Sequence, residues 1–123
     1  MGGKVAVLED DDAIATLLKR LLAMEGYDVT VVRDGRQAMH VLESGSFDAA
    51  LLDVTLPGKD GISIMREIRD NPPTRDLPVV MLTAKTDVGS TWEGWKAGCD
   101  LYVTKPFDPE QLIRWLRGVI HNR

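Results

Sequence analysis

Short apolar runs alternate five times with longer stretches of helical periodicity along this chain. The short runs, rich in Val, Leu and Ala, cover residues 4–8, 29–32, 48–52, 77–82 and 101–103. Their length and their polar borders predict buried β-strands. Between them, apolar residues recur at spacings of three and four in 12–25, 34–45, 61–69, 87–97 and 108–120, which predicts helices. Regular alternation of strands and helices predicts a parallel sheet with helices on both faces.

Polar residues mark several of the helix ends. Gly26 follows the first helical stretch as a C-cap. Asp34 precedes the second with Gln37 three residues later, as in a capping box. The fourth stretch is the weakest, because Gly89 and Gly94 each cost about 1 kcal/mol relative to Ala.

Composition limits the function classes. The chain has 123 residues, 44% of them apolar and 28% charged, which fits one globular domain over residues 1–123. No apolar run approaches the ~18 residues of a membrane span, so we expect no membrane partner. A net charge of -4 without a basic stripe argues against direct nucleic-acid binding. Cys99 is the one cysteine, which excludes an internal disulfide and fits a reducing cytoplasm.

Polar side chains stand where the predicted strands end. Glu9 and Asp10 follow the first strand, and Asp53 follows the third. Thr83 follows the fourth strand and Lys105 the fifth. The carboxyl ends of parallel strands share one edge of the sheet, where such folds bind their ligands. We therefore expect these five side chains to lie together.

Three converging carboxylates repel one another unless a cation lies between them. Oxygen ligands without Cys or a His pair suit Mg²⁺ or Mn²⁺. A carboxylate beside the metal could act as a nucleophile, while Lys105 and Thr83 would neutralise and orient a phosphoryl group. Each feature alone has an ordinary explanation, and for Asp11 and Asp12 a solvated helix start is the preferred one. Their coincidence at four strand ends favours the phosphoryl-transfer interpretation.

The sequence closely resembles the receiver domain of two-component response regulators over essentially its whole length. The matching stretches are VAVLEDDDAIATLL, FDAALLDVTLPGKDGI, RDLPVVMLTA and AGCDLYVTKPFDPEQL. The resemblance implies a flavodoxin-like, doubly wound α/β fold with five helices, and a five-stranded parallel sheet in the order 2-1-3-4-5. It also implies a cis peptide bond between Lys105 and Pro106.

The resemblance also implies roles for particular residues. Asp53 matches the phosphoryl acceptor. Asp53, Glu9, Asp10 and the backbone carbonyl of Thr55 match the ligands of Mg²⁺ or Mn²⁺. These positions make phosphorylation of Asp53 the expected chemistry.

Further matching positions concern catalysis and signalling. Thr83 and Lys105 match the catalytic hydroxyl and lysine, and Ala84 matches a residue that contacts the phosphoryl group. Thr83 and Tyr102 match the switch pair, which implies that the surface of the fourth helix, fifth strand and fifth helix changes on phosphorylation. In the unphosphorylated protein, we expect the Tyr102 ring to occupy mainly a more exposed position. The inward rotamer should be populated as a minor state.

The resemblance implies a phosphohistidine donor on a sensor histidine kinase or a phosphotransfer protein. His40 and His121 do not suit an internal donor, and we expect both to be surface or packing residues. The domain would be no conventional enzyme, with only autophosphorylation and autodephosphorylation. The output partner or domain is unknown.

The sequence departs from the family at the expected output surface. Trp92 and Trp95 stand where smaller aliphatic residues are common; we expect both to pack toward the sheet, and the alternative is an exposed partner anchor. Leu101, Gln111 and Trp115 replace charged residues that mediate dimerisation in DNA-binding relatives.

Two other function classes need features that this sequence lacks. A haloacid-dehalogenase-like Mg²⁺ phosphatase with Asp53 as nucleophile would need a second carboxylate two residues later, where Thr55 stands. A flavodoxin-like ligand-binding protein would need a phosphate-binding loop after the first strand, where Glu9–Asp12 would repel phosphate.

Overall fold

The structure is a computed structural model that describes residues 3–84 and 88–121, except the side chains of 88–92. Its strands are β1 Lys4–Leu8, β2 Asp28–Val32, β3 Ala49–Asp53, β4 Val79–Ala84 and β5 Leu101–Lys105. Its α-helices are α1 Asp12–Met24, α2 Ala38–Ser44, α3 Gly61–Asp70, α4 Val88–Ala97 and α5 Pro109–His121. Two short 3₁₀-helices, η1 Gly35–Gln37 and η2 Pro72–Thr74, complete the described elements.

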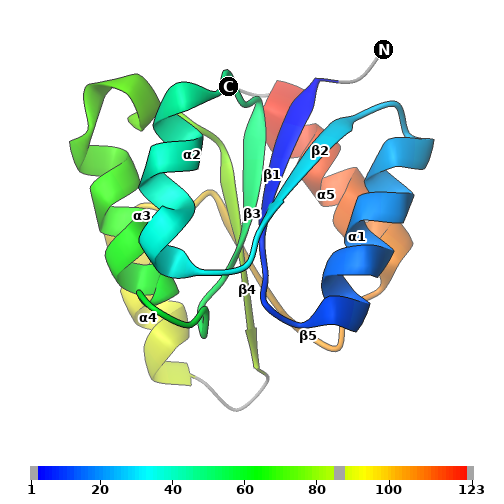
Figure 1. Cartoon of the computed structure of the whole chain (residues 1–123). Coiled ribbons are helices and arrows are strands. Elements are labelled where there is room, and N and C mark those ends of the chain that lie inside the picture. Colours follow the sequence, from blue (N-terminus) through cyan, green and yellow to red (C-terminus); the bar gives the residue numbers. More distant parts are fainter. Residues whose placement is uncertain (1–2, 85–87, 122–123) are drawn as a thin grey trace.

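The strands form one parallel sheet, as predicted. Within the described ranges the sheet has five strands in the order β2-β1-β3-β4-β5, and every neighbouring pair is parallel. The predicted fold class and strand order are confirmed. Figure 1 shows the sheet between two helical layers.

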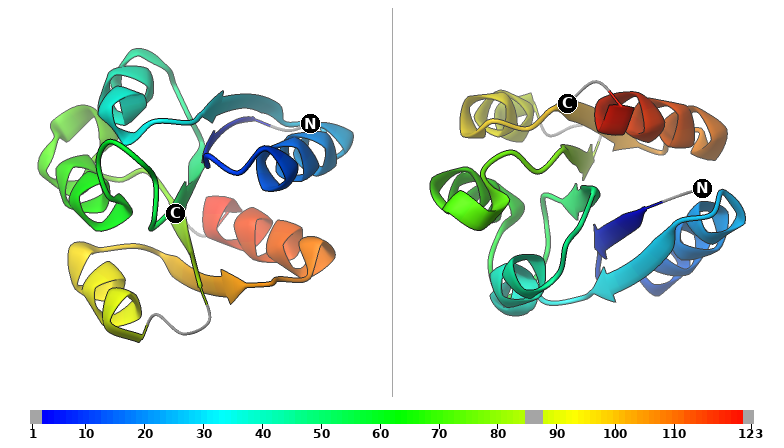
Figure 2. Two further views of the ribbon diagram at one scale, coloured as in Figure 1. Left: turned by 60° about the horizontal axis from the view of Figure 1, so that its bottom comes forward. Right: turned by 90° about the horizontal axis from the view of Figure 1, so that it is seen from above.

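Each face of the sheet has its own apolar core. α1 and α5 cover one face, and α2, α3 and α4 cover the other, as both views in Figure 2 show. Leu51 of β3 packs with α1 and α5 residues such as Leu18 and Leu116. Its neighbour Leu52 packs in the opposite cluster, which includes Ile64 of α3. Successive strand residues face opposite ways, so a sheet covered on both faces needs the continuous apolar runs seen in the sequence.

Three of the strands, β3, β4 and β5, extend further toward their carboxyl ends than the sequence predicted. Asp53 is the last residue of β3, β4 reaches Ala84, and β5 reaches Lys105. Ala84 pairs in register with Lys105. Ladder hydrogen bonding therefore holds the backbone of the acceptor position and of the lysine, rather than leaving both in loops.

The helix starts agree with the sequence in one case and differ in another. Asp11 caps α1 by accepting a hydrogen bond from the Ile14 N–H at 3.1 Å, and Asp12 lies in the first turn, so the helix-start interpretation of these two residues is confirmed. Asp34 caps η1 rather than a continuous α-helix. The Gln37 N–H donates to the Asp34 carbonyl at 3.1 Å, a bond over three residues that closes a 3₁₀ turn.

The prediction that Trp95 packs toward the sheet is wrong. The residue is 46% exposed. Gly94 and Ala97 are the buried positions of this part of α4, and a helix turns about 100° per residue, so Trp95 projects away from the core. The side chain of Trp92 lies outside the described residues.

None of the helices in the described ranges has the length and apolarity to cross a membrane.

Candidate functional site

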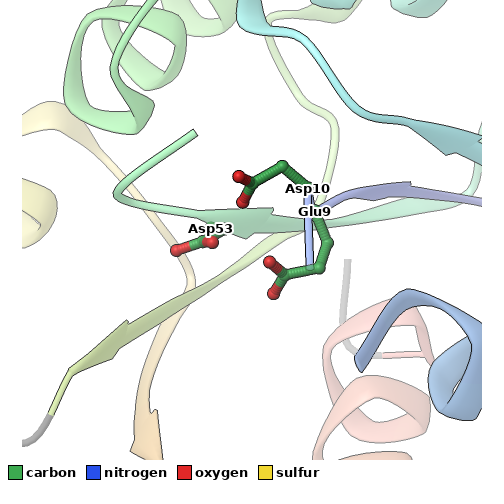
Figure 3. Close-up of side chains that lie close together, drawn as sticks. All are labelled: Glu9, Asp10 and Asp53. Atoms are coloured by element: carbon green, nitrogen blue, oxygen red, sulfur yellow. The ribbon is translucent and has the colours of Figure 1, made fainter. Parts of the chain in front are cut away.

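Three carboxylates meet at the carboxyl edge of the sheet. Glu9 and Asp10 directly follow β1, and Asp53 ends the adjacent strand β3. One carboxylate oxygen from each lies within 4.8 Å of the others (Figure 3). Glu9 and Asp53 are 1% and 2% exposed, whereas Asp10 is exposed. The expected convergence of these three residues is therefore present, with one member open to solvent.

Lys105 connects the two buried carboxylates. Its Nζ lies 2.9 Å from Oε1 of Glu9 and 3.3 Å from Oδ2 of Asp53. The sequence indicated that Lys105 would pair with Asp53, but it did not predict the shorter contact with Glu9. Glu9 precedes α1 in an acidic run that also suited a solvated helix start, so no signal marked this residue as buried.

Burial and charge shift the ionisation of these groups. Burial, with a hydrogen bond to Asp53, raises the pKa of Glu9 to about 7 although Lys105 lowers it. Burial would also raise the pKa of Asp53, but hydrogen bonds with Glu9 and the Thr55 backbone, and then the Lys105 charge, hold it below its ordinary value. Burial lowers the pKa of Lys105, yet both carboxylates together raise it. Asp53 is thus held as the anion, beside a permanent cation.

Thr55 contacts the acceptor carboxylate through two donors. Its backbone N–H and its hydroxyl each donate to Oδ1 of Asp53 at 3.1 Å. Sequence reasoning named only the Thr55 carbonyl and missed the hydroxyl contact. A hydroxyl residue two positions after a strand-end aspartate was the available signal, since such residues donate locally to an Asp side chain in turns.

Thr83 lies on the strand next to the acceptor. Leu82 pairs in register with Asp53, and Thr83 follows it, fully buried. The Thr83 hydroxyl donates to the Ala84 carbonyl at 3.4 Å. Thr83 thus lies on the strand beside Asp53, and Ala84 ends β4. The contact of Ala84 with a phosphoryl group stays a prediction.

Tyr102 lies on the sheet face that α4 covers. Met81, its register partner on β4, points to the same face as Thr83 because side chains alternate along a strand. The ring packs against the core cluster that includes Ala97, and the hydroxyl oxygen is buried. The ring therefore points inward in this structure, and the balance between exposed and inward positions expected for the unphosphorylated protein stays a prediction.

The remaining expectations concern the edge loop and the histidines. The peptide bond between Lys105 and Pro106 is cis, as the resemblance implied. His40 and His121 are both exposed, which confirms their surface assignment.

The donor set fits a hard divalent cation. The three carboxylates provide oxygen ligands within the spacing that a single ion could bridge, and one lysine charge does not balance them. Mg²⁺ binds few protein carboxylates and keeps other positions for water or phosphate oxygens. These residues fit Mg²⁺ on chemical grounds.

The chain thus combines a five-stranded doubly wound sheet with an acidic cluster and a lysine at its carboxyl edge. The profile of the response regulator receiver domain matches residues 5–117. The chain therefore belongs to the receiver domain family of two-component response regulators.

Known proteins support this assignment in sequence and in structure. The DNA-binding response regulator MtrA of Mycolicibacterium smegmatis is 39% identical over 118 residues, 96% of this chain and 50% of MtrA. The transcriptional regulatory protein CpxR of Klebsiella pneumoniae is 39% identical over 117 residues, 95% of this chain and 49% of CpxR. This chain thus spans about half the length of these relatives.

A solved receiver domain shows the same architecture. The receiver domain of the sensor histidine kinase PA1611 from Pseudomonas aeruginosa superposes with a TM-score of 0.90 and 36% identity, covering 98% of this chain and 99% of that one. That structure is described with a magnesium ion coordinated in the active site cleft. The haloacid-dehalogenase-like alternative is not supported, because the family match and these relatives are all receiver or response-regulator proteins.

Proposed function

We propose that residues 1–123 form a single receiver domain that accepts a phosphoryl group on Asp53 from a phosphohistidine. The donor is a sensor histidine kinase or a phosphotransfer protein. The observation that carries this proposal is the contact of Lys105 with both Asp53 and Glu9 at the edge of the sheet. The lysine charge lies beside a carboxylate whose pKa its surroundings hold below the ordinary value.

The proposed reaction is an in-line displacement at phosphorus. A carboxylate oxygen of Asp53 forms the new P–O bond while the P–N bond to the donor imidazole breaks, and the imidazole leaves with the bonding electron pair and takes up a proton. Lys105 offsets charge on the phosphoryl oxygens. Thr83 and the backbone N–H of Ala84 serve as donors to those oxygens, and Thr55 orients Asp53 by donating to Oδ1.

Glu9, Asp10, Asp53 and the Thr55 carbonyl are the proposed ligands of Mg²⁺, with Mn²⁺ as a substitute. When bound, the ion supplies positive charge that offsets the three carboxylates and the incoming phosphoryl oxygens. Glu9 contributes from the buried side of the cluster and Asp10 from the exposed side. This division lets a hydrated cation enter from solvent.

The proposed output is a change in the surface of α4, β5 and α5. Phosphorylation would draw the Thr83 hydroxyl toward the new oxygens and favour the inward position of Tyr102. Exposed aromatic side chains flank this surface, with Trp95 on α4 at 46% exposure and Trp115 on α5 at 42%. The partner that reads this surface defines the output pathway.

The domain is proposed to perform only its own phosphorylation and dephosphorylation, in the cytoplasm, without contacting nucleic acid or membrane directly. Turnover of p-nitrophenyl phosphate tests the enzymatic alternative. A phosphatase would release p-nitrophenol over many cycles in the presence of Mg²⁺. A receiver domain should give no sustained release above that of an Asp53→Asn variant.

Intact-mass spectrometry after incubation with acetyl phosphate and Mg²⁺ tests the acceptor. Wild type should gain the mass of one phosphoryl group, and hydroxylamine should remove it, as expected for an acyl phosphate. Asp53→Asn should keep the fold and gain nothing. The matched control is Asp28→Asn, an exposed position at the start of β2, which should behave as wild type. Phosphorylation of Asp53→Asn at the wild-type rate would refute the assignment.

A further inference from the structure

The loop that follows the acceptor, residues 54–60, leads from β3 into α3 and contains Thr55. Its two ends are joined, because the Gly61 N–H donates to the Val54 carbonyl at 2.9 Å. Between these ends the loop follows the last residue of β3. Its middle therefore needs a support from elsewhere in the chain if the backbone at Thr55 is to stay in one place.

That support is the turn at the start of η1, formed by its cap residue Asp34 and its first residue Gly35. The Gly35 N–H donates to the Pro57 carbonyl at 2.7 Å. A Cβ at Gly35 would lie 2.1 Å from the Lys59 carbonyl oxygen and 2.8 Å from the Lys59 nitrogen. These neighbours are backbone atoms, so a side chain at position 35 would displace the loop itself rather than a flexible neighbour.

A second contact joins Gly58 of the loop to the Asp34 side chain of the turn. Gly58 has φ of 85°, and a Cβ there would lie 2.2 Å from Oδ1 of Asp34. The same Oδ1 accepts hydrogen bonds from the Arg36 backbone N–H at 2.8 Å and from its Nε at 3.1 Å. The Arg36 guanidinium also pairs with Oδ2 at 2.7 Å. Hydrogen bonds with Arg36 thus fix the Asp34 carboxylate against which Gly58 packs.

Thr55 lies between two fixed points. On one side its N–H and hydroxyl hold Oδ1 of Asp53, and on the other the Pro57 carbonyl is held by Gly35. We propose that the Asp34–Gly35 turn is the positioning element of the 54–60 loop, and that it sets the affinity of the carboxylate cluster for a divalent cation by fixing the backbone at Thr55. This inference rests on the proposed function, in which the Thr55 carbonyl is a metal ligand.

The test is a Mg²⁺ titration of folded protein, measured by isothermal calorimetry and by amide NMR shifts. Gly35→Ala should raise the Mg²⁺ Kd about tenfold or more, the range found when groups that orient metal ligands are removed. Amide shifts should change at Thr55 and Asp53 even without Mg²⁺, because the loop has moved. Asp34→Ala, which removes the side chain beside Gly58 and its hydrogen bonds to Arg36 without adding atoms, should raise the Kd in the same direction by a smaller factor.

Gly45→Ala is the matched control at the opposite end of α2. A Cβ at Gly45 would lie 2.4 Å from the Phe47 ring, so this substitution is also crowded, but it is remote from the loop. It should lower stability and leave the Mg²⁺ Kd unchanged. An equal loss of affinity in Gly45→Ala would show that general destabilisation is the cause, and the proposal would then fail.

The metal site and the positioning role of the turn are tested separately by these measurements. If wild type shows no Mg²⁺ binding, the proposed metal site is wrong. If wild type binds Mg²⁺ and Gly35→Ala binds it with the same Kd, the positioning role is wrong while the site stands. If Gly35→Ala does not fold, Asp34→Ala decides, and an unchanged Kd in that variant overturns the positioning role.

Discussion

The ring of Tyr102 lies directly against Gly94, so closely that a Cβ at position 94 would come within 2.2 Å of Cε2 of the ring. The contact joins β5 to α4 beneath the proposed output surface. Gly94 weakened the helix prediction from sequence, because glycine lowers helix stability. The structure gives its spatial reason: there is no room for a methyl group while the tyrosine ring points inward.

Gly94→Ala should therefore destabilise the protein and drive Tyr102 outward. Helix propensity alone would favour Ala, but overpacking of a filled core costs about 1–3 kcal/mol. Urea unfolding should show the loss, and NMR of the Tyr102 ring should show greater exposure. Gly118→Ala is the control, since nothing lies within 4 Å of its Cβ position in α5. It should gain about 0.5–1 kcal/mol. A gain of the same size in Gly94→Ala would contradict the proposed contact.

Most of the fold could be predicted from the sequence because its signals are local. The strand runs, the alternation of elements and the strand-end residues Glu9, Asp10 and Asp53 each depend on neighbours in the chain. Trp95 could not be placed correctly, because its orientation depends on Gly94 and Ala97 facing the core. The contact between Lys105 and Glu9 could not be predicted either, because it forms only when β1 and β5 are assembled in one sheet.

The Asp34–Gly35 turn shows a similar limit. The sequence offered a capping box and predicted one helix start, whereas the chain forms a 3₁₀ turn before α2. A turn there lets the Gly35 N–H reach the Pro57 carbonyl. No local sequence pattern reports the tertiary contact with the 54–60 loop. Sequence periodicity therefore could not distinguish a 3₁₀ turn from the start of an α-helix at this position.

Asp10→Ala should weaken Mg²⁺ binding and raise stability slightly without the ion, because it removes one of three mutually repelling carboxylates. A cation at 100 times its Kd stabilises a protein by about 2.7 kcal/mol, and a tenfold weaker Kd removes about 1.4 kcal/mol of this. Thermal unfolding with and without Mg²⁺ should show a smaller shift in the variant. Asp28→Ala removes the same charge elsewhere and should keep the wild-type shift. Equal shifts in Asp10→Ala and wild type would argue against a cation held by Asp10.

Cys99 should resist alkylation in the folded protein. The thiol is 7% exposed, and burial, followed by the nearby Asp100 charge, raises its pKa from 9.0 to about 11. The thiolate is the reactive form, so iodoacetamide at pH 8 should modify native protein far more slowly than protein unfolded in urea. Mass spectrometry over time measures both rates, and similar rates would show that Cys99 is accessible.

The same shift has a consequence for stability at alkaline pH. Because the folded-state pKa lies above the unfolded one, the neutral thiol stabilises the fold fully below pH 9, and this contribution is lost as the pH rises toward about 11. Urea unfolding of wild type and Cys99→Ala over this range isolates the effect from other titrating groups. The wild-type free energy of unfolding should fall more steeply with pH than that of the variant. Parallel curves would contradict the shift.

Thr83→Ala should separate phosphorylation from its transmission. Thr83 is buried beside the register partner of Asp53 and shares a sheet face with Tyr102. Without its hydroxyl, Asp53 should still accept phosphate, more slowly, but the Tyr102 surface should respond weakly. NMR of the beryllofluoride-bound form should show large shift changes around Tyr102 in wild type and small ones in Thr83→Ala. Thr16→Ala, an exposed position on α1, is the control and should respond as wild type. If Thr83→Ala showed the wild-type changes around Tyr102, the hydroxyl would not be the link between the acceptor and this surface.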